Sequence, residues 1–294
     1  LIQFAFYGGY ATMASPAALF IRKYSYKSGI LLGLALYAVG AFLFIPAAEW
    51  QSFAFFCFSL YILTFGLAFL ETTANPFILS LGDKETSTRR LNLAQAFNPV
   101  GSLSGMAVAS FIVLPNLISD KRDAAGEVIF GTLSEAEKAG IRLHDLAVIR
   151  DPYVALGLFV LCVFVVIALT KMPVVREDER VSEGAHTVKQ TLTNLWRNTL
   201  YREGVFTQMC YVGAQIMVWT FIIQYADHLG LNKAVAQTYN IVAMSLNLGG
   251  RFLGTYIMRY VNSRRLLTIF GVGAAVCTLG AIFIQGMCGL YSLI

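Results

Sequence analysis

Charged side chains are scarce in this sequence. Only 13% of its 294 residues are Asp, Glu, Lys or Arg, while 57% are hydrophobic. Ordinary soluble domains are roughly a quarter charged. A soluble chain of this length would need more charge to cover its surface, so lipid must cover much of this one. The composition excludes an ordinary soluble protein and predicts an all-α, polytopic membrane protein.

Histidine and cysteine are also few. The three His residues are scattered, and the five Cys residues lie in or beside apolar runs without a C-x-x-C pair. We therefore expect no metal, no cofactor and no catalytic residues, and hence no enzyme. The net charge of +5 comes from short basic clusters between apolar runs, which indicates cytoplasmic loops rather than a surface for nucleic acid.

An initiator methionine and a signal peptide are absent too. The sequence begins at Leu1 within an apolar run and stops at Ile294. We interpret it as a fragment that lacks membrane spans at both ends, with one span before Leu1 as the simplest arrangement.

Long apolar segments make up most of the chain. A bilayer span takes about 20 residues. Eight segments qualify, at approximately 1–21, 28–47, 52–81, 91–114, 151–172, 204–228, 235–258 and 266–288. A longer charged stretch predicts an N-terminal helical half at 1–172, a cytoplasmic linker at 173–203 and a C-terminal helical half at 204–294. Ser134 and Glu137 have capping-box spacing, so we expect a short surface helix there.

The basic residues set the orientation of these spans. Counted over alternate loops, 15 Lys and Arg residues fall on one side and 6 on the other, with Arg251 inside a span. The positive-inside rule then places the 82–90 and 173–203 loops in the cytoplasm.

Glu71 is the sharpest feature of the apolar runs. A charged carboxylate at this depth costs several kcal/mol, and the loss of water favours the protonated form. A group that changes its charge with access to water is what proton coupling requires. The alternative is a structural carboxyl bonded to neighbouring helices.

Polar residues line one helical face together with Glu71, and others line one face of the next span. Thr64, Ala68, Glu71 and Asn75 fall on one stripe, and Pro76 follows directly. Gln95 and Asn98 lie within a narrow arc of the next span. Amides in lipid are costly unless they face a polar partner or a cavity, so the stripe indicates a cavity or a helix–helix contact.

The later spans repeat this pattern. Tyr211, Gln215 and Trp219 share one helical face, and rings beside amides suit a sugar, although packing explains them equally well. Asn247 and Arg251 share a stripe in the following span, where Arg251 is either structural or functional. The pairs Gly8-Gly9 and Gly249-Gly250 predict close helix approaches.

Two motifs are specific to one family. Leu70-Glu-Thr-Thr-Ala-Asn-Pro76 and Arg90-Leu-Asn-Leu-Ala-Gln-Ala-Phe-Asn98 resemble the fucose–galactose–glucose:proton symporters of the major facilitator superfamily. Tyr211-Val-Gly-Ala-Gln215 and Gly250-Arg-Phe-Leu-Gly-Thr255 are similar to the same family. The resemblance implies two six-helix halves, of which this chain covers about eight complete helices. It also implies that Glu71 is the protonatable glutamate and that Gln95 and Asn98 line the cavity.

The same resemblance implies the function. We expect a monomeric, multi-pass protein of the bacterial inner membrane that imports a monosaccharide with a proton by alternating access. L-fucose is the first candidate sugar, contacted by Asn75, Gln95, Asn98, Tyr211, Gln215, Trp219 and Asn247. Glucose, galactose or N-acetylglucosamine symport and a non-transporting sugar sensor are the alternatives. A second coupling carboxylate is expected upstream of Leu1.

Overall fold

The computed structural model describes residues 1–119, 130, 133–173, 188–229, 233–284 and 286–293. All regular elements in these ranges are helical, which confirms the predicted all-α fold. The chain divides into two compact units. The first joins Leu1–Leu91 with Ser104–Val175, and the second joins Asn92–Leu103 with Arg176–Ile294. The predicted halves at 1–172 and 204–294 stay a prediction, and residues 174–187 of the linker between them lie outside the described residues.

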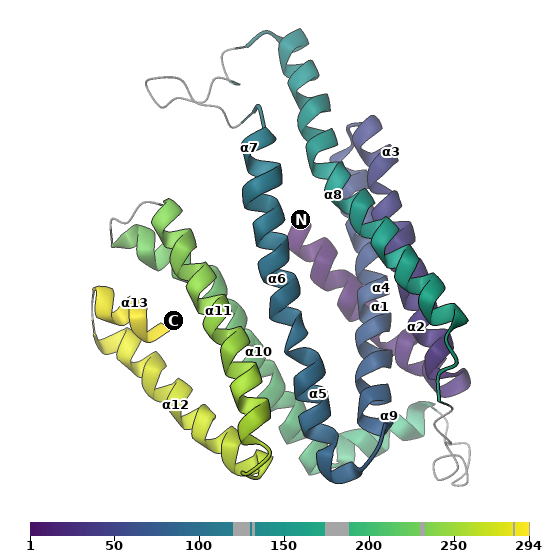
Figure 1. Cartoon of the computed structure of the whole chain (residues 1–294), viewed down its shortest axis with the longest axis vertical. Helices are drawn as coiled ribbons and strands as arrows, with labels where there is room; N and C mark the ends of the chain where they lie inside the picture. Colours follow the sequence, from purple (N-terminus) through teal and green to yellow (C-terminus); the bar gives the residue numbers. More distant parts are fainter. Residues whose placement is uncertain (120–129, 131–132, 174–187, 230–232, 285, 294) are drawn as a thin grey trace. The chain divides into compact units, whose positions relative to one another are not determined.

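Four long helices build the first unit. They are α1 (Ile2–Lys23), α2 (Tyr26–Phe42), α4 (Phe53–Ser80) and α8 (Glu135–Leu169). Helix α4 packs against both α1 and α2, and α8 packs against α2 (Figure 1). A side chain at Gly40 or Gly66 would collide with the backbone of the facing helix, so only glycine allows α2 and α4 to lie this close.

Helix α1 approaches α4 just as closely. A Cβ at Gly9 would lie 2.8 Å from the Cβ of Thr64. One turn further along α1, the Thr12 hydroxyl lies 2.9 Å from the hydroxyl of Tyr61. The close approach predicted at Gly8-Gly9 is therefore confirmed at Gly9.

The span predicted at 91–114 is not one continuous α-helix. Shorter elements of the first part of the chain are α3 (Phe44–Glu49), the 3₁₀ helix η1 (Lys84–Thr86), α5 (Ser87–Gln95), α6 (Phe97–Val108), the π-helix η2 (Ala109–Val113) and α7 (Leu114–Asn116). A turn at Ala96 separates α5 from α6. Pro99 explains this break, because proline cannot donate the hydrogen bond to the carbonyl four residues earlier.

Helix α8 merges two elements that the sequence predicts as separate. Ser134 and Glu137 form the predicted capping box at its start. The short surface helix predicted there was wrong in its extent, because α8 runs on for 35 residues through Pro152 to Leu169. At 1.5 Å per residue it is about 52 Å long, whereas the hydrocarbon core is about 30 Å thick. Its polar first turns therefore extend beyond the hydrocarbon.

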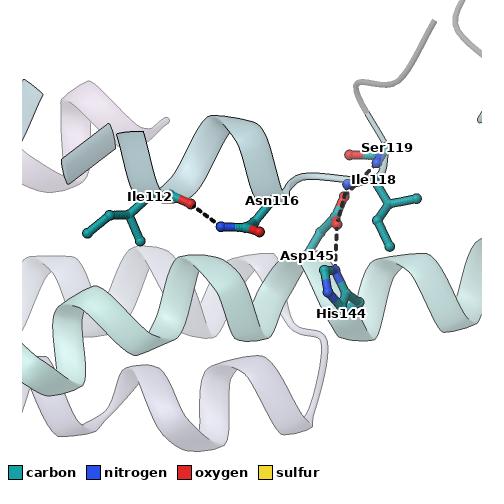
Figure 2. Close-up of polar contacts among 6 residues, drawn as sticks. All are labelled: Ile112, Asn116, Ile118, Ser119, His144 and Asp145. Carbon is teal, nitrogen blue, oxygen red and sulfur yellow. Dashed lines mark hydrogen bonds and ion pairs between the residues drawn. The ribbon is translucent and has the colours of Figure 1, made fainter. Parts of the chain in front are cut away.

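A buried carboxylate ties α8 to the segment after α7. Asp145, which is only 7% exposed, accepts hydrogen bonds from the backbone N–H groups of Ile118 and Ser119, each at 2.9 Å (Figure 2). A ring nitrogen of His144 lies 3.2 Å from the same carboxylate. The carboxylate thus pairs with two backbone donors in the non-helical segment that follows α7.

Helices also account for the second unit. They are α9 (Val188–Arg197), α10 (Thr199–His228), α11 (Lys233–Ile257), α12 (Ser263–Phe283) and α13 (Met287–Leu293), together with the segment Asn92–Leu103. Helix α10 packs on α11, and α12 packs on α13 (Figure 1). The close approach predicted at Gly249-Gly250 was wrong among the described residues, since a Cβ at either position meets no atom within 4 Å.

Six of the described helical segments are long and apolar enough to cross a membrane. They are Tyr26–Glu49, Phe53–Ser80, Lys84–Asn116, Ala136–Leu169, Thr199–Ile222 and Ser263–Phe283. The other two predicted spans form helices α1 and α11 but fall outside this set of six. Their apolar character is diluted by Gly, Ser, Thr and Tyr in α1 and by Asn, Gln and Arg in α11.

Candidate functional site

Glu71 lies in the second half of α4, with apolar turns on either side. Thr64 and Ala68 on the same stripe are buried against neighbouring helices, whereas Glu71 is exposed on the first unit. The stripe therefore runs from a packed helix contact to an open position. A carboxyl group placed this way can exchange a proton with whatever fills the space beside α4.

Tyr10 of α1 is the partner of this carboxyl group. Its half-buried side chain makes a hydrogen-bonding interaction with Glu71. The contact is built by the close packing of α1 on α4 next to Gly9. Sequence reasoning missed Tyr10, because only the tertiary packing of two spans distant in sequence brings it to Glu71.

Asn75 lies one turn after Glu71 and is half-buried. Pro76 follows it without ending the helix, which continues to Ser80. The predicted stripe from Glu71 to Asn75 thus exists on a continuous helical surface. It places one carboxyl and one amide side by side on α4.

Gln95 and Asn98 lie on either side of the break between α5 and α6. Gln95 is the last residue of α5, and Asn98 is the second residue of α6. Asn98 is exposed and Gln95 is half-buried. Both amides therefore flank the break at Ala96, and their directions depend on the backbone geometry there.

Arg251 of α11 contacts the break between α5 and α6. Its Nη1 donates a long hydrogen bond of 3.4 Å to the main-chain carbonyl of Gln95. No carboxylate among the described residues forms an ion pair with it. The sequence predicted either a structural or a functional role for Arg251. Its partner in the structure is the backbone of Gln95, a residue predicted to contact the sugar.

Side-chain bonds from Asn92 and Thr255 support the same contact. Asn92 Nδ2 donates to the Arg251 carbonyl at 3.2 Å and to Thr255 Oγ1 at 2.7 Å. Thr255 Oγ1 in turn donates to the Arg251 carbonyl at 2.8 Å. All of these residues belong to the second unit.

The remaining predicted sugar contacts lie on α10 and α11. Tyr211 is 58% exposed, while Gln215 and Asn247 are half-buried. No hydrogen bond joins these three side chains to other described residues, so their polar groups are available. The Trp219 side chain lies outside the described residues.

The structure therefore resolves the predicted site into two sets. Glu71 and Asn75 belong to the first unit, with Tyr10 added by the structure. In the second unit, Arg251 contacts Gln95, Asn98 lies three residues after Gln95, and Tyr211, Gln215 and Asn247 lie on two packed helices. Within the described ranges, no three His, Cys, Asp or Glu residues are placed to hold a metal ion.

The chain is similar to known sugar–proton symporters. The chain is 60% identical over 294 residues to the L-fucose-proton symporter of Haemophilus influenzae, covering all of this chain and 68% of that protein. It is 35% identical over 297 residues to the L-fucose-proton symporter of Escherichia coli, covering 66% of that protein. The chain thus spans about two thirds of the length of both relatives.

A solved structure and a family model match as well. The crystal structure of the Escherichia coli fucose:proton symporter superposes with a TM-score of 0.89 at 33% identity, covering 99% of this chain and 70% of that one. The predicted resemblance to fucose–galactose–glucose:proton symporters is confirmed by these relatives. The model of the Major Facilitator Superfamily matches residues 1–294. The chain belongs to the Major Facilitator Superfamily.

Proposed function

We propose that this protein is a proton-coupled symporter that imports L-fucose. The observation that carries the proposal is the 60% identity, along the whole chain, to a protein named as an L-fucose-proton symporter. Such identity over every span supports the same solute rather than the same fold alone. Glucose, galactose and N-acetylglucosamine are the alternative sugars, because one hydroxyl or methyl group changes the fit of a sugar by only a few kcal/mol.

Glu71 is the proton carrier in this proposal. Its position among apolar turns makes the charged form costly unless water or a partner reaches it, and Tyr10 supplies such a partner. The carboxyl group loads a proton when its side of the protein is open to the outside. It releases that proton when it becomes open to the cytoplasm.

The sugar is held by amides and rings. Gln95 and Asn98 offer donors and acceptors to the hydroxyl groups, as Gln215 and Asn247 do from α10 and α11. Asn75 adds a further amide beside Glu71, and the rings of Tyr211 and Trp219 suit the apolar face of the sugar. Binding near the middle of the bilayer, between helices of the two halves, is the arrangement that alternating access uses.

The setting of the protein follows from its basic loops. The excess of Lys and Arg on one side supports an orientation with the 82–90 and 173–203 loops in the cytoplasm, and the bacterial relatives support the inner membrane. The partners are then the sugar, the proton and the lipid bilayer. We propose that the protein acts as a monomer.

Competition for uptake tests the substrate. Cells that express the intact protein are given labelled L-fucose with an excess of unlabelled L-fucose, galactose, glucose or N-acetylglucosamine. We expect unlabelled L-fucose to compete most strongly. Stronger competition by another sugar would overturn the substrate, and binding of sugar without any uptake would indicate the sensor alternative.

A further inference from the structure

The break between α5 and α6 leaves a backbone carbonyl without its helical donor. In an α-helix the carbonyl of residue 95 accepts a hydrogen bond from the N–H of residue 99. Residue 99 is a proline, which has no N–H and whose ring pushes against that carbonyl. The Gln95 carbonyl therefore needs another donor, since an unpaired carbonyl away from water is costly.

Arg251 supplies that donor. Its Nη1 lies 3.4 Å from the Gln95 carbonyl oxygen, from the neighbouring helix α11. Nearby, the rings of Phe97 and Phe252 meet edge to face with their centroids 6.0 Å apart. The guanidinium thus reaches the break between α5 and α6, where α11 already packs against the start of α6.

The backbone of Arg251 is itself held in place. Asn92 Nδ2 and Thr255 Oγ1 both donate to its carbonyl, at 3.2 and 2.8 Å. Thr255 is 8% exposed, and its hydroxyl also accepts from Asn92 at 2.7 Å. These bonds fix α11 against the last turn of α5, one turn before the break at Ala96.

We propose that Arg251, supported by Asn92 and Thr255, is a positioning residue for sugar binding. By holding the carbonyl that Pro99 frees, it fixes the backbone at the break between α5 and α6 and with it the directions of the Gln95 and Asn98 side chains. The inference rests on the proposed sugar-binding role of these two amides. It assigns a common purpose to residues of two motifs, Arg90–Asn98 and Gly250–Thr255.

The first test measures binding of L-fucose to the intact protein in detergent by isothermal titration calorimetry. We expect Arg251→Gln to raise the Kd on the order of tenfold. A glutamine is too short to reach the Gln95 carbonyl, so the backbone at the break is no longer held in place. Arg264→Gln is the matched control, since Arg264 is exposed on α12 and its side chain forms no hydrogen bond or ion pair with other described residues. We expect the control to bind as the wild type does.

The second test asks whether Arg251 acts through the carbonyl. Pro99→Ala restores a backbone N–H that can bond to the Gln95 carbonyl, so the two residues should be coupled. In the Pro99→Ala background we expect Arg251→Gln to raise the Kd by less than about twofold. An equal loss of affinity in both backgrounds would overturn the positioning role, because it would mean that Arg251 acts elsewhere.

Three further outcomes are decisive. A lower thermal stability of Arg251→Gln with an unchanged Kd would reduce Arg251 to a structural residue and overturn the inference. If Arg251→Gln does not fold, Thr255→Val removes only a hydroxyl and should raise the Kd about threefold, and an unchanged Kd would contradict the proposal. A wild-type protein that binds none of the candidate sugars would instead contradict the proposed function.

Discussion

The chain contains two Asn-Pro steps in apolar helices, and they have different consequences. Helix α4 continues through Asn75-Pro76 to Ser80, whereas the helical run is broken three residues before Pro99. Each proline removes one helical hydrogen bond. In α4 the flanking helices α1 and α2 press close through glycine contacts, and at the second step Arg251 takes up the freed carbonyl. Proline can interrupt a helix, and the neighbouring groups decide whether it does.

The difference separates the two tasks of the proposed symporter. The unbroken helix carries Glu71, whose protonation does not require a special backbone geometry. The broken one carries Gln95 and Asn98, whose side-chain directions must match a sugar. We therefore expect changes in α4 to affect proton coupling and changes at the second step to affect affinity.

The largest effect should come from Glu71→Gln. A glutamine cannot carry a proton, so proton-driven accumulation of labelled L-fucose in cells should fall to about the external concentration. Exchange of internal for external sugar should persist, because the amide still resembles the protonated carboxyl. Glu49→Gln, at the exposed end of α3, is the control and should accumulate sugar normally. Accumulation by Glu71→Gln against a gradient would assign the proton to another residue.

Asn98→Ala should have the next largest effect, on affinity alone. Loss of a hydrogen bond to a sugar hydroxyl costs about 1–3 kcal/mol, so the Kd for L-fucose should rise by about tenfold or more. Titration calorimetry measures this, with Asn116→Ala as the control on the outer end of α7. An Asn98→Ala protein with unchanged affinity but lost coupling would reverse the division of tasks between the two helices.

Gly66→Ala tests the packing of α2 against α4, which continues unbroken through Pro76. The new methyl group would overlap the Tyr37 backbone of α2, and such overpacking costs about 1–3 kcal/mol of stability. Gly101→Ala is the control, because a Cβ there meets no described atom within 4 Å. Thermal unfolding in detergent should show a lower midpoint for Gly66→Ala only. Equal midpoints would mean that α2 does not constrain α4.

The smallest effect is expected from Pro76→Ala. Helix α4 already has helical geometry there, so a restored N–H changes little, and the Kd should shift by less than about twofold. Pro99→Ala should shift the Kd several-fold more, because it alters the break between α5 and α6, which is flanked by two residues proposed to contact the sugar. Comparable shifts for the two variants in the same binding assay would remove the contrast between the two Asn-Pro steps.

The sequence was sufficient for much of the fold. Apolar runs located the helices, and the spacing of Ser134 and Glu137 located the start of α8. It could not locate the end of that surface helix, because Pro152 is compatible with both a break and a continuous helix. It placed Glu71, Gln95 and Asn98 on helices, since helical periodicity is local. It missed Tyr10, because that contact depends on how distant spans pack.

Proton movement that depends on sugar is the most direct test of the central claim. Proteoliposomes with the intact protein and no imposed gradient are placed in a weakly buffered medium, and a pH electrode records the response to added L-fucose. Symport predicts that the medium becomes alkaline on addition of L-fucose and not in vesicles that carry Glu71→Gln. Uptake of labelled L-fucose by wild-type vesicles with no change in external pH would contradict it.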